Sequence, residues 1–205
     1  DRSVRVAWAD DAPAIGAVQA RAWQQSYADV LPPAALAAVD ADAFAETWRH
    51  AVVRPPTARH RVLVALERNA VVGLAATAPS EDVDAGPGDA EMVAFHVDPG
   101  ALGAGHGSRL LTAVVDTMRA DGFSHARVWL VVGDDAVRGF LESAGWVADG
   151  AHRALDPTGD GRATPPHDEP AAHRLRRHAG LRRARARGAA RRRARARGGV
   201  HPTGP

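Results

Sequence analysis

The stretch from Ala90 to Leu111, AEMVAFHVDPGALGAGHGSRLL, most constrains what this chain can fold into. Its apolar, alternating first half predicts a strand, and Asp98 and Pro99 end that strand because proline cannot donate to the ladder. A helix then opens near Ser108. Between strand and helix lie four glycines: Gly100, Gly103, Gly105 and Gly107. Without Cβ atoms several backbone N–H groups can point the same way, and the helix start adds unpaired donors, so the stretch predicts an anion cradle suited to phosphate.

The chain before this stretch predicts a helical N-terminal third followed by a hairpin. Alternation predicts a strand over residues 3–8, and capping residues with apolar repeats predict three helices, from Asp10 or Asp11 to about residue 27–30, over 33–39, and over 41–53. The runs RVLVALE (61–67) and AVVGLAA (70–76) predict an antiparallel hairpin closed by Arg68 and Asn69.

The chain after residue 111 predicts alternating strands and helices. The helix continues to Gly122, residues 127–132 form a buried strand, a helix capped by Asp134 or Asp135 runs to about residue 144, and a strand begins at residue 146. Residues 172–181 supply a candidate last strand. This order predicts an α/β chain with a mixed sheet.

Charge divides the chain into two unlike parts. The first 170 residues carry 14 basic and all 24 acidic side chains, whereas residues 171–205 carry 12 arginines and no acid. We therefore predict one domain over residues 1–155, a linker with the candidate last strand over 156–181, and a low-complexity Arg/Ala tail over 182–205. The tail has the charge for non-specific nucleic-acid binding but no aromatic residues to stack on bases.

Several classes of protein are excluded or disfavoured by what the chain lacks. It contains no cysteine, which excludes disulfides, thiolate metal sites and a cysteine nucleophile. No apolar run has the length of a membrane span and no signal pattern opens the chain, so we expect a cytoplasmic protein that does not enter the membrane. The histidine spacing predicts no metal site, and no Gly-Lys-Ser/Thr follows the loop as in an NTP-binding P-loop.

The Val-Asp-Pro strand end, the spaced glycines and the amphipathic helix resemble the acetyl-CoA site of the GNAT superfamily of N-acetyltransferases. The N-terminal segment AVQARAWQQSYADVLP and the segment DDAVRGFLESAGW are also similar to that family, so the resemblance covers roughly residues 3–150. It implies a mixed, mostly antiparallel sheet flanked by helices, and acetyl transfer from acetyl-CoA to an amine on a small molecule or peptide. A homodimer is compatible with it. The implied acetyl-CoA contacts are Phe95, His96, Val97, Leu102, Gly103, Ala104, Gly105, His106, Gly107, Ser108, Asp134 and Arg138.

The resemblance fails at three side chains around the loop. Leu102 stands where the family has arginine or glutamine, which removes a charge-assisted contact normally worth about 1.5 to 3 kcal/mol, and Arg109 is a candidate substitute. Leu141 stands where the family has the tyrosine that protonates the leaving thiolate. Asp134 stands where an asparagine commonly contacts the cofactor, and it can simply cap a helix. The chain's single tyrosine, Tyr27, is expected to lie far from the thiolate.

Direct attack of the amine in a ternary complex is the economical mechanism for a chain without cysteine. The resemblance assigns thioester polarisation to backbone N–H groups around Phe95–Val97 and offers Glu91 as the catalytic base, directly or through water. A solvated carboxylate is the alternative for Glu91. Strand alternation places His96 on the face opposite Glu91 unless a bulge resets the phase, and a packing or surface role is expected for it.

Trp23 and Tyr27, four residues apart on one helical face, are candidate acceptor contacts, with core packing as the alternative. Two other functions stay open for the chain as a whole. One is dinucleotide binding through the glycine loop, although Ser108 replaces the third glycine of that motif and the loop follows a hairpin. The other is a non-catalytic acyl-CoA-binding or interaction module on the same fold.

Overall fold

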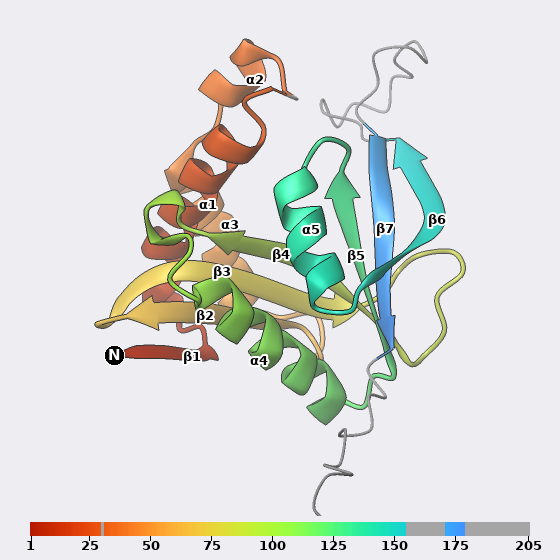
Figure 1. The fold of residues 1–205 in the computed structure, drawn as a ribbon. Coiled ribbons are helices and arrows are strands. Elements are labelled where there is room, and N and C mark those ends of the chain that lie inside the picture. The colour runs from red at the N-terminus through yellow and green to blue at the C-terminus, as the bar shows by residue number, and fades with distance from the viewer. Residues whose placement is uncertain (30, 155–170, 179–205) are drawn as a thin grey trace, which may run out of the picture.

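The computed structural model describes residues 1–29, 31–154 and 171–178, which form one mixed sheet with helices on both faces (Figure 1). The strands are β1 (Arg2–Val6), β2 (Arg61–Glu67), β3 (Ala70–Pro79), β4 (Asp89–Val97), β5 (His125–Val131), β6 (Val147–Ala154) and β7 (Ala171–His178). The α-helices are α1 (Ala12–Ser26), α2 (Pro33–Ala37), α3 (Ala41–Val53), α4 (His106–Ala120) and α5 (Asp135–Ser143). Short 3₁₀ turns precede α1 and follow β4.

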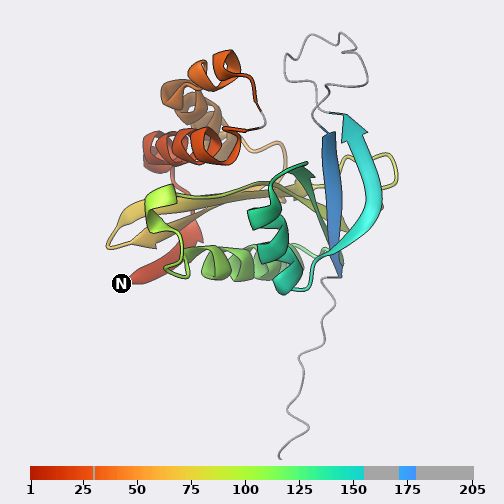
Figure 2. The same cartoon turned by 45° about the horizontal axis from the view of Figure 1, so that its top comes forward.

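The strands lie in the order β1-β2-β3-β4-β5-β7-β6. Only β4 and β5 pair in parallel; the other neighbours are antiparallel. Helices α1 to α3 cover one face of the sheet and α4 lies on the other, as the turned view in Figure 2 makes clear. The predicted mixed, mostly antiparallel sheet flanked by helices is therefore confirmed.

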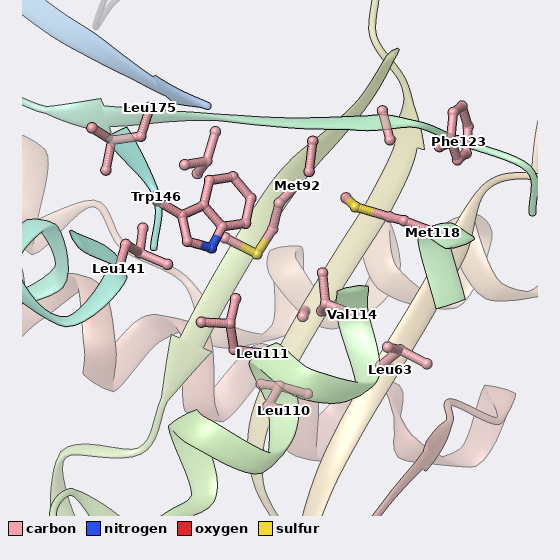
Figure 3. Packing of buried hydrophobic residues seen from close by; sticks show 14 of the residues in the cluster. Leu63, Met92, Leu110, Leu111, Val114, Met118, Phe123, Leu141, Trp146 and Leu175 are labelled. Carbon is pink, nitrogen blue, oxygen red and sulfur yellow. The ribbon is translucent and has the colours of Figure 1, made fainter. Parts of the chain in front are cut away.

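Two clusters of buried side chains hold the helices on the sheet. The larger one lies on the α4 face, where Leu110, Val114 and Met118 of α4 pack around Met92 and Trp146 (Figure 3). The smaller cluster lies under α1 and contains Ile15, Val18 and Leu74. Each cluster matches the apolar stripe of the helix above it, so burial of these stripes supplies the main favourable term for this fold.

Helix caps and turn residues in the sequence predicted several element ends that the structure shows. Helix α3 covers the predicted residues, and the Asp40 carboxylate accepts the Asp42 N–H at 2.9 Å as its N-cap. Arg68 and Asn69 have φ angles of 48° and 72°, as a two-residue hairpin turn requires.

The candidate last strand exists as β7. It lies between β5 and β6, so the sheet extends beyond the predicted boundary at residue 155. The linker residues 156–170 and the tail over 182–205, with its predicted nucleic-acid binding, lie outside the described residues.

Candidate active site

The parallel strands β4 and β5 diverge soon after they pair. Pairing of β4 with β5 stops at Glu91↔Arg127, whereas β4 continues to Val97 and β5 to Val131. Figure 1 shows the two strands leaving their paired ends in different directions. A cavity of about 620 Å³ opens where they diverge, with α1 on one side and the glycine loop and α5 on the other.

A bulge in β4 decides which side chains face that cavity. Ala94 lies opposite Ala76 and Met92 opposite Thr77, so Val93 has no partner on β3. One extra residue reverses the alternation that follows. Ala94 consequently packs under α1 and Phe95 against the α4 cluster.

The same bulge overturns the expected placement of His96. Its Nε2 lies 3.4 Å from the indole Nε1 of Trp23 on α1, so His96 is on the α1 face of the sheet rather than on the face opposite Glu91. Burial lowers the pKa of His96 to about 4, so the imidazole is neutral at physiological pH. Trp23 donates the hydrogen bond and the neutral ring accepts it.

The edge of β4 that faces β5 carries unpaired backbone donors. The N–H of Asp98 donates to the Val72 carbonyl of β3 at 2.8 Å. Successive residues of a strand direct their N–H groups to alternate edges, so those of Val97 and Phe95 face the cavity, beyond the point where β5 has turned away. These are two of the three positions at which the resemblance expects polarising donors.

The glycine loop brings further backbone donors to the cavity. Gly103 and Gly105 have φ angles of +75° and +82°, which side-chain-bearing residues rarely adopt, and Gly105 is the N-cap of α4 without a side-chain cap. The first N–H groups of α4 have no partner within the helix. Asp98 anchors the loop, because its carboxylate accepts from Gly100 N at 2.9 Å and from Arg21 Nε of α1 at 3.0 Å.

The predicted cofactor residues divide into two groups. Those that line the cavity are Phe95, His96, Val97, Leu102, Gly103, Gly105, Gly107, Ser108 and Asp134. Ala104, His106 and Arg138 do not. The Ala104 carbonyl accepts from Arg2 of β1 at 2.8 Å, and Nε2 of the buried His106 ring lies 3.6 Å from Glu67 of β2, so both residues lie on the side of the loop that faces these two strands.

Aromatic side chains of α1 and α3 form the opposite wall. Trp23 and Tyr27 both line the cavity, and their rings meet edge to face at 5.4 Å. Tyr27, which was expected to lie far from the thiolate, lines the same cavity as the glycine loop, because the cavity extends between the diverging strands to α1. Burial, and secondarily Asp134, raise the pKa of Tyr27 to about 12, so its hydroxyl keeps its proton.

Glu91 does not line this cavity, although the next two residues of β4, Met92 and Val93, do. It sits at the last paired position of β4, opposite Arg127 of β5. Burial is the main cause that raises its pKa, and the carboxylate of Asp82 adds to it, while Arg153 and Arg127 act in the opposite direction. Glu91 is therefore a half-buried carboxylate that holds a proton more readily than an exposed one.

An ion-pair cluster, made of Arg127, Arg174 and Arg176 with Asp82, Asp84, Asp89 and Asp149, surrounds this end of β4. Arg127 Nη2 lies 2.6 Å from Asp89, and Arg174 Nη1 lies 2.9 Å from Asp82. The cluster ties the loop between β3 and β4 to strands β5 and β7. No signal within a single segment announces it, since its members are separated by up to 92 residues.

The three departures from the family pattern lie at the cavity as well. Leu102 is exposed at its mouth and Leu141 is fully buried in its wall. Asp134 caps α5 by accepting the Val137 N–H at 3.2 Å, and burial raises its pKa. Arg109 folds back on the loop, with Nη1 3.2 Å from the Gly105 carbonyl, so a positive charge stays next to the α4 N-terminus.

Some cavity residues were missed by sequence reasoning. Phe140 of α5 stacks on Phe95 at 5.9 Å between ring centroids, and Trp48 of α3 donates to Gln19 of α1 at 2.6 Å. Trp48 lies in the helix predicted over residues 41–53, and nothing in the sequence around it indicates that it borders a cavity.

The described ranges contain neither a metal site nor a membrane-spanning helix. No group of three or more His, Cys, Asp or Glu side chains in residues 1–29, 31–154 and 171–178 is arranged to hold a metal ion. In the same ranges, no helix combines the length and the apolar character needed to cross a membrane.

Comparison with known proteins gives one family and several similar structures. A sequence model of the acetyltransferase (GNAT) family matches residues 17–146. The PaiA N-acetyltransferase of Thermoplasma acidophilum, solved in complex with coenzyme A, has a TM-score of 0.67 at 13% identity, covering 87% of this chain and 99% of that one. YncA of Salmonella typhimurium, solved with acetyl-CoA, has a TM-score of 0.64 at 20% identity, covering 90% and 97%.

A third similar structure is the ribosomal-protein-alanine N-acetyltransferase of Brucella melitensis. Its TM-score is 0.64 at 20% identity, and the alignment covers 86% of this chain and 99% of that one. Comparison with curated protein sequences gives no match. At these identities the solved structures establish the fold, and the family match covers well over half of the chain.

Proposed function

The chain belongs to the acetyltransferase (GNAT) family, and from this premise we propose that it transfers an acetyl group from acetyl-CoA to a primary amine by direct attack in a ternary complex. The family match confirms the predicted enzyme class, an acetyl-CoA-dependent N-acetyltransferase. The roles of individual residues in binding and catalysis, and the direct attack itself, are our proposal.

The parting of β4 and β5 after Glu91↔Arg127 is the observation that carries this function. It leaves the inward edge of β4 without a strand partner and opens the sheet from the glycine loop through to α1. An extended, amide-containing chain can pair with such an edge as a strand would. The pantetheine arm of acetyl-CoA is such a chain.

The residues present fit acetyl-CoA. A Cβ on Gly107 would sit 3.6 Å from Phe140 and 3.8 Å from Val97, so this glycine keeps open the space between β4, α4 and α5. The unpaired amides at the start of α4 suit a pyrophosphate, and Arg109 adds the positive charge that Leu102 does not supply. Acetyl-CoA brings an activated acetyl group, and the chain brings the donors that hold and polarise it.

Polarisation of the thioester is assigned to the N–H groups of Phe95 and Val97. They are held by the strand before the cosubstrate arrives, so no reorganisation is needed as negative charge develops on the carbonyl oxygen. Such preorganised donors commonly contribute factors of roughly 10² to 10³ in rate.

Proton removal from the attacking amine is assigned to Glu91. His96, with a pKa of about 4, is too weak a base, and Tyr27, with a pKa of about 12, keeps its proton. Glu91 has a raised pKa, which brings it closer to the operating pH. Because Glu91 does not line the cavity, it acts through a water molecule that relays the proton.

The leaving thiolate receives no proton from the position where the family has a tyrosine. Leu141 is fully buried there and has no ionisable group. Since a thiol has a moderate pKa, its anion can leave without protein assistance.

Release of coenzyme A from acetyl-CoA, followed with a thiol reagent over a panel of amines, tests this function. The chain has no cysteine, so the reagent reports only the released thiol. We expect amine-dependent release, and a loss of tenfold or more in kcat/KM for Glu91→Gln at neutral pH. Glu142→Gln, an exposed change on α5 outside the cavity, serves as the matched control.

The pH profile separates catalysis from a structural role of Glu91. The base must be deprotonated, so activity should fall at acid pH with a midpoint above the ordinary glutamate pKa, and this acid limb should be absent in Glu91→Gln. Unchanged turnover in that variant would remove Glu91 from the mechanism. Coenzyme A binding without thiol release for any amine would contradict catalysis and support a non-catalytic acyl-CoA-binding module.

A further inference from the structure

The cavity side of α1 and α3 points to the chemical class of the acceptor. We propose that the acceptor is an aromatic or apolar primary monoamine without a carboxylate or phosphate, bound against Trp23, Tyr27 and Trp48. This inference rests on the acetyl transfer proposed above and adds the identity of the amine.

Two of the three rings in the wall that the acceptor would meet are indoles, and their N–H groups already have partners. The Trp23 N–H donates to His96 at 3.4 Å, and the Trp48 N–H donates to Gln19 at 2.6 Å. Gln19 is itself buried. Because these donors and acceptors satisfy one another, the two indoles offer apolar and π surface to a ligand rather than hydrogen bonds.

The ring wall is also held in place before any acceptor arrives. Trp23 packs edge to face on Tyr27 at 5.4 Å and on Phe44 at 5.3 Å between ring centroids. A preorganised aromatic surface loses little conformational entropy on binding and suits a flat or apolar group of matching size.

Charge at the cavity limits the acceptor further. Among the cavity-lining residues that the structure describes, none is an arginine, and Asp134 is the only one with a carboxylate. A carboxylate or phosphate on the acceptor would be buried without a cation, which is costly. An acceptor with several amino groups would need more than one acid. A single ammonium group, by contrast, finds one carboxylate in Asp134 and no repulsion from His96, which is neutral at physiological pH.

Matched acceptors test this proposal on the full chain. Tryptamine and tryptophan differ by one carboxylate, and spermidine carries several amino groups without a ring. We expect kcat/KM for tryptamine to exceed those for tryptophan and spermidine by at least a hundredfold. In calorimetry without acetyl-CoA, tryptamine should bind, whereas tryptophan and spermidine should not. Equal or better use of tryptophan or spermidine would overturn the acceptor class while leaving acetyl transfer intact. Absence of thiol release with every amine would instead overturn the proposed function.

Two variants locate the acceptor site. Trp23→Leu should raise the KM for tryptamine at least tenfold and leave coenzyme A binding unchanged. The control is Trp8→Leu, the same change at an indole that is 64% exposed and lies outside the cavity. It should alter neither the KM nor coenzyme A binding. Ser26→Arg at the exposed rim of the cavity avoids any packing defect, and it should raise the KM for tryptamine and lower that for tryptophan. Unchanged KM values in both Trp23→Leu and Ser26→Arg would overturn the location.

Discussion

The indole N–H of Trp23 on helix α1 points at Nε2 of His96 on strand β4, 3.4 Å away. This contact crosses from the first helix of the chain to the bulged strand and closes one side of the cavity between them. For His96 to accept it, the ring must be neutral with its proton on Nδ1, in agreement with a pKa lowered to about 4 by burial.

The neutral His96 makes the fold sensitive to acid. In the unfolded chain a histidine titrates near pH 6.5, so between pH 6.5 and about pH 4 the unfolded state binds a proton that the folded state does not. The stability that depends on a neutral His96 is therefore fully present above pH 6.5, and it is lost as the pH falls. We expect the advantage of the wild type over His96→Gln to shrink by about 2 to 3 kcal/mol between pH 7 and pH 4 in urea unfolding. His50→Gln, at an exposed histidine of α3, serves as the matched control, and a pH dependence of His96→Gln equal to that of the wild type would contradict this prediction.

Substitution of Gly107 should weaken coenzyme A binding without destabilising the fold. It is the second residue of α4, and a Cβ there would meet Phe140 and Val97 only at ordinary contact distances of 3.6 and 3.8 Å. Gly107→Ala should therefore leave the free energy of unfolding unchanged or raise it by up to about 1 kcal/mol, because alanine restricts the unfolded chain. Its methyl group would occupy space assigned to the cosubstrate, so coenzyme A affinity should fall at least tenfold in calorimetry.

The matched control for Gly107 is Gly139 in α5. A Cβ there meets nothing within 4 Å, and the residue does not line the cavity. Gly139→Ala should stabilise the protein by roughly 0.5 to 1 kcal/mol and leave coenzyme A binding unchanged. Equal affinity of the two variants would show that the cosubstrate does not pass Gly107.

Arg174 and Arg176 share two acidic partners, Asp84 and Asp149, but differ in burial. The Arg174 side chain is 7% exposed and lies within hydrogen-bond distance of Asp82, Asp84 and Asp149, whereas the Arg176 side chain is 40% exposed. Removal of a buried partner leaves carboxylates uncompensated, so Arg174→Gln should cost roughly 3 kcal/mol or more, and Arg176→Gln less than about 1 kcal/mol. Chemical unfolding of both variants measures the difference. Equal losses would show that burial does not set the strength of this cluster.

Much of this fold was predictable because its signals are local. The Asp40 cap, the Arg68-Asn69 turn and the spaced glycines act within a few residues, and each matches the structure. The features that were missed depend on partners distant in the chain. Insertion of β7 between β5 and β6, and the ion-pair cluster, join segments separated by tens of residues.

The candidate site was predictable to the same extent. Its backbone half follows from glycine spacing, but the side chains that face the cavity depend on one bulge at Val93. A single extra residue in β4 reverses the faces of His96 and Phe95, and no residue type in AEMVAFHV signals where the extra residue lies. Divergence of β4 from β5 likewise results from packing and brings Tyr27 into the site.

Leu102 gives the sharpest test of where the phosphates bind. It is 58% exposed at the mouth of the cavity, where the family has arginine or glutamine, so a longer polar side chain can be placed there without disturbing the core. An arginine would add a charge-assisted hydrogen bond of about 1.5 to 3 kcal/mol in an otherwise unchanged site, part of which is offset by ordering the side chain.

Leu102→Arg should therefore lower the dissociation constant for coenzyme A and the KM for acetyl-CoA by about tenfold. Because this contact is equally strong in the ground state and the transition state, kcat should not change. Leu102→Gln should gain less, since it adds a donor without a charge, and Leu102→Ala should gain nothing. Raised ionic strength should reduce the gain of the arginine variant, because exposed charges are screened by salt. If Leu102→Arg binds no more tightly than Leu102→Ala at low salt, the pyrophosphate does not lie at residues 102–107, and the assignment of the glycine loop is wrong.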